Sequence, residues 1–158
     1  MKFPTTVRYG ARAMIQLAAA YPDRAVSVRE VGQQQNISPK YLEHILQALK
    51  AAGLVKVVRG KRGGYVLGSP PGDITLKELY ESLAGSLAPV ECVDCPDSCS
   101  NHETCPTRDT WVEVKEAVEA VLERTTIQDL LERNNRKAIA SSPRSPARVS
   151  TKHPTARH

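Results

Sequence analysis

The chain has 158 residues, which suffices for one compact domain with an appended segment but not for two full-size domains. No apolar run approaches the roughly 20 residues of a membrane span. Arg8 and Arg12 interrupt the stretch where the apolar core of a signal peptide would lie. We therefore exclude a membrane-spanning protein and expect a cytoplasmic one.

Charge is divided unevenly along the chain. Residues 1–65 carry eleven Lys and Arg against three acidic residues, a balance of +8, whereas residues 66–135 carry five against fourteen, a balance of −9. Residues 136–158 carry six basic residues and no acidic one. A basic head predicts a polyanionic partner, because neutralising phosphates releases condensed counterions. On charge alone, chance asymmetry on a solvated surface stays open as an alternative.

In chain order, the first predicted element is a helix over residues 5–20, where apolar residues recur at helical spacing. Pro22 ends it, since the residue before a proline avoids helical geometry. Ser27 and Glu30 then have the spacing of a capping box, which predicts a short second helix running to about Gln35.

A third helix is predicted to begin at Ser38, a capping residue followed by Pro39 at the first helical position. Its apolar stripe consists of Leu42, Ile45, Leu46 and Leu49, and Gly53 ends it. Two short helices joined by a tight turn form a helix-turn-helix.

Two strand-like runs follow, at residues 54–58 and 65–67, and they flank a glycine-rich turn. Glycine permits the positive φ that tight turns need, so the pattern predicts a hairpin. Three basic residues lie at or beside its tip: Arg59, Lys61 and Arg62. A hairpin directly after a helix-turn-helix is a wing.

The third helix and the wing are the predicted DNA-reading elements, because a recognition helix places its amino-terminal residues in the major groove. Lys40 can reach phosphate or guanine, Glu43 can accept from cytosine, and Arg59 suits a narrow minor groove. The remaining candidates on the exposed face of the helix are Ser38, Tyr41, His44 and Gln47. Any one of these is equally compatible with an ordinary solvated side chain.

The second half opens with a linker at residues 69–72 and a second capping box, Thr75 with Glu78, which predicts a helix through about Leu83. Residues 84–106 are predicted to be irregular. A last short helix, capped at Thr126 and ending at Leu131, precedes a basic tail over residues 136–158 that is expected to be disordered.

Between these elements a long helix is predicted to begin at about Arg108. Its narrow apolar seam consists of Trp111, Val114, Val118, Val121 and Leu122. Such a seam on a charged helix suits packing against a partner helix, which predicts a dimer. Burial within the same subunit is the alternative.

All four cysteines lie within one short loop: Cys92, Cys95, Cys99 and Cys105. Clustered thiols in a cytosolic chain indicate metal binding or redox chemistry rather than structural disulfides. The gaps between successive cysteines widen from two to three to five residues. This spacing favours an iron–sulfur cluster over a structural zinc site, whose ligands usually come in two closely spaced pairs. Zinc binding and thiol redox chemistry stay open. His102 is either a further ligand or an exposed loop residue.

Four segments together resemble the IscR/NsrR/RirA/CymR superfamily of bacterial winged-helix repressors. They are Tyr9-Gly-Ala-Arg-Ala-Met14, Ser38-Pro-Lys-Tyr-Leu-Glu43, Val58-Arg-Gly-Lys-Arg-Gly-Gly-Tyr65 and the cysteine loop through Cys105-Pro-Thr-Arg-Asp-Thr-Trp111. The resemblance covers residues 1 to about 132. It implies a homodimer that binds palindromic promoter DNA, is joined through the long helix and holds one iron–sulfur cluster per subunit.

The same resemblance maps the three family cysteines onto Cys92, Cys99 and Cys105. IscR-like members have a histidine where this chain has Thr107, and NsrR-like members have an acidic residue where it has Arg8. Neither fourth ligand carries over, so Cys95 becomes the candidate, with water or an exogenous ligand as the rival. A 2Fe–2S and a 4Fe–4S cluster are both compatible with these residues.

The sequence therefore predicts a mainly α protein: a winged helix-turn-helix at residues 1–68, and a cysteine-bearing loop with a long dimerisation helix at 69–135. The predicted function is that of a DNA-binding transcription regulator, not an enzyme, in which a cluster on the loop senses iron–sulfur status, redox state or nitric oxide. One alternative is a cluster-free or zinc and thiol regulator, for example of cysteine metabolism. Another is a small thiol redox protein, which lacks its usual βαβ context.

Overall fold

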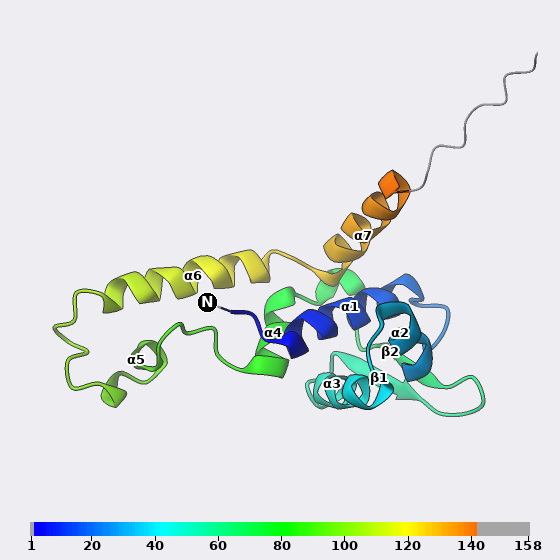
Figure 1. Ribbon diagram of the computed structural model, residues 1–158, viewed down its shortest axis with the longest axis horizontal. Helices are drawn as coiled ribbons and strands as arrows, with labels where there is room; N and C mark the ends of the chain where they lie inside the picture. Colours follow the sequence, from blue (N-terminus) through cyan, green and yellow to red (C-terminus); the bar gives the residue numbers. More distant parts are fainter. Residues whose placement is uncertain (1, 142–158) are drawn as a thin grey trace, which may run out of the picture.

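The computed structural model describes residues 2–141 and confirms the mainly helical winged helix-turn-helix architecture (Figure 1). The helices are α1 (Thr5–Ala19), α2 (Val28–Gln35), α3 (Pro39–Ala51), α4 (Leu76–Ala84), α5 (Glu91–Asp94), α6 (Arg108–Glu123) and α7 (Ile127–Ser141), with two 3-10 turns, η1 (Pro71–Asp73) and η2 (Pro96–Ser98). The strands are β1 (Val55–Val58) and β2 (Gly64–Leu67). No helix within residues 2–141 is long and apolar enough to cross a membrane.

Side-chain caps start the two helices of the helix-turn-helix. The Oγ of Ser27 accepts from the amide of Glu30 at 3.1 Å, and the Oγ of Ser38 accepts from the amide of Tyr41 at 3.3 Å. Asn36 ends α2 in the left-handed conformation, at φ 53°, which asparagine tolerates better than most residues. The sharp turn between α2 and α3 follows from these local choices.

The capping box predicted at Ser27 is wrong in its second half. The carboxylate of Glu30 does not return to the amide of Ser27. It receives two hydrogen bonds from the guanidinium of Arg24, at 2.7 and 3.0 Å. A bidentate ionic pair is stronger than a bond from a neutral amide, so Arg24, six residues earlier, takes the carboxylate.

The wing is a two-stranded antiparallel hairpin in which Val55 pairs with Leu67 and Val58 with Gly64. Val26, from the segment before α2, forms a bridge with Tyr65 through bonds of 2.8 and 2.9 Å. A Cβ on Gly64 would lie 2.4 Å from the carbonyl oxygen of Val26. Glycine at this position therefore permits the close approach that joins the wing to the helical head.

The core lies where α1 crosses α3 and α4. Its largest fully buried side chains are Met14, Leu17, Val31, Leu42, Ile45, Leu46, Leu49, Val55, Ile74, Leu79 and Ile127. Gly10 marks the crossing itself, because a Cβ there would lie 2.5 Å from the Cδ1 of Leu83 and 3.5 Å from the Cγ2 of Ile45. Side chains of α3 and α4 therefore pack directly on α1 at Gly10, where a larger residue would not fit.

Helix α4 begins with the complete capping box that the sequence predicts. The amide of Glu78 donates to the Oγ1 of Thr75 at 3.2 Å, and the amide of Thr75 donates to the carboxylate of Glu78 at 2.8 Å. Both orphan amides at the start of the helix are thus satisfied.

Replacing Thr75 with alanine is expected to lower the free energy of unfolding by about 1 kcal/mol, because the helix loses its N-cap acceptor. Urea denaturation followed by circular dichroism measures this loss. Thr110→Ala is the matched control, since Thr110 is an exposed threonine of α6 without a capping role. Equal losses in the two variants would contradict the capping contribution.

Two segments of the second half differ from the sequence-based predictions. The loop over residues 84–106, predicted to be irregular, contains the short helices α5 and η2. Helix α7 does not end at Leu131 but continues to Ser141, so residues 136–141 are helical. Arg, Lys and Ala in this stretch favour a helix intrinsically without an apolar period to reveal it. The rest of the expected tail, 142–158, lies outside the described residues.

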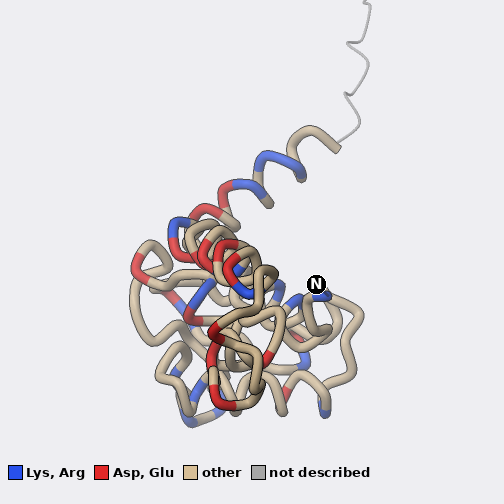
Figure 2. Tube along the Cα trace, turned by 90° about the vertical axis from the view of Figure 1, so that its left-hand side faces the viewer, with Lys and Arg blue, Asp and Glu red and all other residues tan. Residues whose placement is uncertain are grey.

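Residues 85–123 form an arm that extends from the head (Figure 1). The cysteine loop and α5 pack along α6, and α6 packs on α4 near its own carboxyl-terminal end. The arm carries nine acidic residues against two basic ones. Figure 2 views the molecule from the end of the arm, and the positions of Asp and Glu, in red, recur along the arm in this view. The basic head and the acidic arm are therefore distinct in space as well as in sequence.

Candidate DNA interface and cysteine loop

The exposed side of α3 presents most of the predicted DNA-reading residues to solvent. Lys40, Glu43 and His44 are exposed on its first turns. Ser38 is also exposed, but its hydroxyl already accepts from the helix amide as the N-cap. Gln47 is exposed on the next turn and donates to the hydroxyl of Tyr65 at 3.3 Å. Helix α3 is thereby tied to the wing.

Tyr41 differs from its neighbours on α3 because it is half-buried. Its ring packs edge-to-face on Tyr9, with the centroids 6.0 Å apart. The guanidinium of Arg12 lies 5.6 Å from the centre of the Tyr9 ring and donates to the side chain and the carbonyl of Gln35, at 2.7 and 3.0 Å. Sequence reasoning did not find this cluster, which fixes α1 against both helices of the helix-turn-helix.

The wing residues Arg59, Lys61 and Arg62 are all exposed. A groove of about 530 Å³ beside β1 brings Arg59 together with Lys50 and Lys56. A second groove, of about 340 Å³, brings Lys61 and Arg62 together with Arg24. The three additional cations, Lys50, Lys56 and Arg24, were not among the predicted interface residues. Their only sequence signal is the excess of basic residues in the head.

The ion pair between Arg24 and Glu30 beside the wing makes the stability of the head depend on pH. The hydrogen bond from Arg24 lowers the pKa of Glu30 below its usual 4.5. A carboxyl whose pKa is lowered on folding stabilises the fold above its unfolded pKa, and this contribution is lost as the pH falls through the folded pKa.

The melting temperature of Glu30→Gln is therefore expected to be slightly lower than that of the wild type at neutral pH. The two melting temperatures should be equal once the pH is below the lowered pKa of Glu30. The effect is small because both side chains are partly exposed. Thermal melts at pH 7 and at stepwise lower pH measure it, with Glu43→Gln on α3 as the control. A constant difference between Glu30→Gln and wild type at every pH would contradict the assignment.

The cysteine loop holds four free thiols, of which Cys95 is exposed and Cys92, Cys99 and Cys105 are half-buried. Within residues 2–141, no three Cys, His, Asp or Glu side chains lie close enough together to hold a metal ion. The Nδ1 of His102 lies 2.9 Å from the carbonyl oxygen of Cys99 rather than facing a thiol. The four predicted ligands thus share one loop but not one site in this conformation.

Cys105 differs from the other three thiols in its surroundings. Its Sγ lies 3.3 Å from the Oγ1 of Thr107, just before α6 begins. Hydrogen bonds from that hydroxyl and from the backbone amides of Thr107 and Arg108 lower the pKa of the Cys105 thiol. The thiolate, which is the form that binds metal and reacts with oxidants, is therefore favoured at this position.

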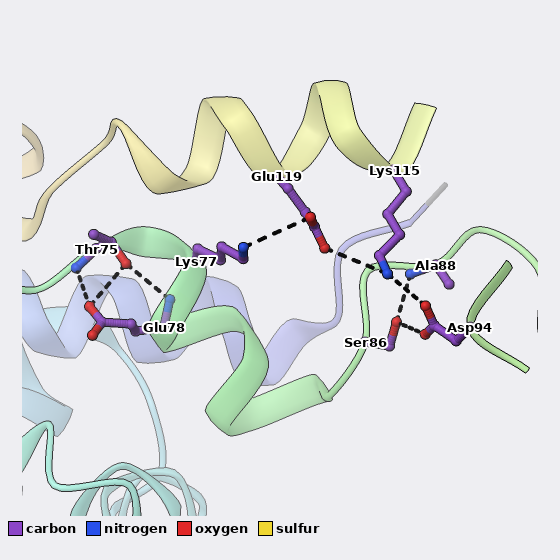
Figure 3. A network of polar contacts seen from close by, with 8 residues as sticks. All are labelled: Thr75, Lys77, Glu78, Ser86, Ala88, Asp94, Lys115 and Glu119. Atoms are coloured by element: carbon purple, nitrogen blue, oxygen red, sulfur yellow. Dashed lines mark hydrogen bonds and ion pairs between the residues drawn. The ribbon is translucent and has the colours of Figure 1, made fainter. Parts of the chain in front are cut away.

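Two contacts hold the cysteine loop against α6 (Figure 3 shows the second). The Nε of Arg108 donates to the carbonyl oxygen of Cys92 at 3.1 Å. The Nζ of Lys115 lies 2.6 Å from the Oδ1 of Asp94, a residue between the first two cysteines, and the hydroxyl of Ser86 donates to the other carboxylate oxygen. These two donors hold the pKa of Asp94 below its usual value.

The predicted dimerisation seam on α6 divides between two environments. Trp111 and Val121 are exposed, at 38% and 46%, whereas Val114 is half-buried and Val118 packs partly on the core. Leu122 is buried within its own subunit. It lines an apolar groove of about 290 Å³ together with Phe3, Val7, Arg8, Ala11, Leu76 and Tyr80. For Leu122, burial in the same subunit is the correct alternative.

Comparison with known proteins places this architecture in a family. The family model for Rrf2, described as an iron-dependent transcriptional regulator, matches residues 3–133. The HTH-type transcriptional regulator CymR of Bacillus subtilis (strain 168) is 39% identical over 130 residues, which are 82% of this chain and 89% of CymR. Protein rrf2 of Nitratidesulfovibrio vulgaris is 34% identical over 131 residues, which are 83% of this chain and 87% of that protein.

Two solved structures are similar over nearly the same extent. The structure of CymR (YrzC), the global cysteine regulator of B. subtilis, has a TM-score of 0.71 at 37% identity and covers 84% of this chain and 98% of its own. The structure of T. potens IscR has a TM-score of 0.71 at 33% identity and covers 87% of this chain and 90% of its own. Both neighbours share the winged helix-turn-helix, and the family model and CymR are named as transcriptional regulators rather than enzymes. The chain belongs to the Rrf2 family of DNA-binding transcriptional regulators.

Proposed function

We propose that this regulator binds palindromic promoter DNA as a homodimer and senses its signal through an iron–sulfur cluster on the cysteine loop. The observation that carries the proposal is the placement of four free thiols directly before α6, in a loop that is bonded to that helix. The iron-dependent description of the family model supports it.

The head supplies the DNA contacts in this proposal. Lys40, Glu43 and His44 on the exposed face of α3 read the major groove, and Arg59 at the wing enters the minor groove. Lys61 and Arg62 neutralise phosphates, which contributes affinity without sequence preference. Tyr41 contributes by holding α3 against α1 through Tyr9 rather than by reading bases.

Thiolates are the usual ligands of iron–sulfur clusters, so the donor set fits the group chemically. Cys92, Cys99 and Cys105 are the proposed ligands, with Cys95 as the fourth. When bound, a cluster would make the state of the loop depend on iron supply, oxygen or nitric oxide. Because no three of these thiols are gathered in the described conformation, binding requires the loop to rearrange. The loop is bonded to Arg108 and Lys115, so such a rearrangement would displace α6 as well.

The dimer surface in this proposal is the exposed part of α6. Trp111 and Val121 leave apolar area in water, and covering it against a second copy is favourable by about 25 cal/mol per Å². Val114 and Val118 lie beside them on the same helix. A change in the position of α6 then alters the spacing of the two recognition helices, which decides whether both reach their half-sites.

Anaerobic purification followed by absorption spectroscopy, iron and sulfide analysis and native mass spectrometry tests the proposal. We expect visible iron–sulfur absorption, acid-labile sulfide and a dimer mass. Cys92→Ser should abolish the absorption, and Ser100→Ala in the same loop should not. Protein without iron or sulfide, with DNA binding unchanged in Cys92→Ser, would overturn cluster sensing and leave the assignment to the family intact.

A second candidate function is a cluster-free regulator whose cysteines bind zinc or undergo thiol oxidation. Two observations favour its thiol-oxidation form: the thiols are not gathered, and the pKa of Cys105 is lowered toward the reactive thiolate. The similar structure of the B. subtilis cysteine regulator supports a signal from cysteine metabolism. Zinc at one equivalent per subunit, or no metal together with oxidant-sensitive DNA binding, would favour this candidate over the first.

A further inference from the structure

A row of alternating charges connects the cysteine loop to α4, the helix that packs on α1 and α3 of the head (Figure 3). It starts at Asp94 on α5, whose Oδ1 lies 2.6 Å from the Nζ of Lys115 on α6. The same Nζ lies 3.8 Å from the Oε1 of Glu119, one turn further along α6. The Oε2 of Glu119 lies 3.8 Å from the Nζ of Lys77 on α4. Each of the two inner residues thus has two partners of opposite charge.

These four side chains are shielded more than ordinary surface ions, with 24–29% of each side chain exposed. An exposed ion pair contributes little, because water and salt screen it and two long side chains lose freedom. Partial shielding reduces the screening, and having two charged partners restricts the side chains of Lys115 and Glu119. The helical spacing of Lys115 and Glu119 is ordinary, but the contacts at either end join three different elements.

Two donors hold Asp94, the residue of α5 at which the row begins. The hydroxyl of Ser86, in the segment after α4, donates to the carboxylate oxygen of Asp94 that Lys115 does not contact. The amide of Ala88 donates in turn to that hydroxyl at 2.9 Å. A displacement of α5, which carries Cys92 within it and is followed at once by Cys95, therefore cannot occur without disturbing Asp94 and its two donors.

The end of the row at α4 leads into the core. Lys77 lies on the first turn of α4, two residues before the fully buried Leu79. Leu79 and Leu83 of α4 and Ile45 of α3 all lie within 4 Å of the position that a Cβ on Gly10 would take, where both helices pack on α1. Closely packed interiors transmit displacement rather than absorb it. A shift of α4 is therefore passed to the helix that carries the DNA-reading residues.

We propose that Lys115 and Glu119 form an ionic relay that positions α5 relative to α4 and transmits chemical change at the cysteines to the DNA-reading head. The inference rests on the proposed function in one respect, that the loop is the sensor. It does not depend on whether the signal is a cluster, zinc or thiol oxidation.

Hydrogen–deuterium exchange of the full-length protein, before and after alkylation of the thiols with iodoacetamide, tests the relay. In the wild type, alkylation is expected to speed exchange in α5 and also in α4. In Glu119→Gln the response in α5 should persist, while the response in α4 should fall about fivefold or more, the usual range of coupling between sites. Glu116→Gln is the matched control, because Glu116 is exposed on the same helix and has no ion pair among the described residues.

A second variant, Lys77→Met, breaks the relay at its other end and should give the same loss of response in α4. Lys115→Arg keeps the charge and should retain most of the response. The relay is overturned if α4 in the wild type does not respond to alkylation, or if it responds equally in Glu119→Gln and wild type. Because the probe is an alkylating agent, absence of iron in the purified protein would refute cluster sensing without affecting this result.

Discussion

Replacing Ile45 with alanine is expected to lower the free energy of unfolding by about 2–5 kcal/mol, the usual cost of deleting a fully buried aliphatic side chain. Ile45 has no exposed surface. Its Cγ2 lies at the crossing of α1, α3 and α4, 3.5 Å from the point where a Cβ on Gly10 would lie. Three helices therefore border the cavity, and none of them can move into it without losing contacts elsewhere.

The chain supplies a control of identical chemistry for this experiment. Ile139 on α7 is 77% exposed, so Ile139→Ala should change stability by no more than about 0.5 kcal/mol. Urea denaturation monitored by circular dichroism measures both variants under the same conditions. Comparable losses in the two would show that α3 is not packed as the structure describes.

Replacing Arg59 with alanine is expected to weaken binding to the operator by about 5- to 150-fold, equivalent to about 1–3 kcal/mol. Arg59 is exposed on the wing and makes no hydrogen bond or ion pair with another described side chain. Its guanidinium is therefore free of intramolecular partners among the described residues and available for the proposed contact with a narrow minor groove, where the negative potential is strongest. Removing it should also relax sequence preference at the base pairs beneath the wing.

The operator for this measurement is first selected from a random duplex library by the wild-type protein. Fluorescence anisotropy at several salt concentrations then gives both the affinity and the number of phosphate contacts. Arg124→Ala is the control, because Arg124 is exposed at the end of α6, away from α3 and the wing. If Arg59→Ala and Arg124→Ala bound the selected operator equally well, Arg59 would not be part of the interface.

Features that depend on neighbours in sequence were predictable. The caps at Ser38 and Thr75, and the hairpin around the glycines before Tyr65, require only residues within a few positions of one another. The helix-turn-helix and the wing follow from these signals with little tertiary information. Their combination with the cysteine loop was sufficient to predict the family.

Features that depend on partners outside the element itself were not predictable in the same way. Glu30 has the spacing of a capping box, but a guanidinium at Arg24 competes for its carboxylate. Leu122 fits the same apolar seam as Val121, yet it points into its own subunit while Val121 remains exposed. The contact between Lys115 and Asp94 joins residues 21 positions apart. No periodic pattern indicates such a pair, because its geometry is set by how the arm folds back on itself.

The separation of a basic head from an acidic arm has a consequence for kinetics. The acidic arm extends away from the basic part of the chain that carries α3 and the wing (Figure 1), so charges of opposite sign lie apart and the molecule has an electric dipole. In the field of a duplex the arm is repelled and the head attracted, so collisions with the head in front are enriched before any base is touched. Such steering raises the association rate and fades as salt screens the field. The rate at which this regulator finds DNA should therefore depend on the charges of the arm, a segment outside the proposed DNA interface.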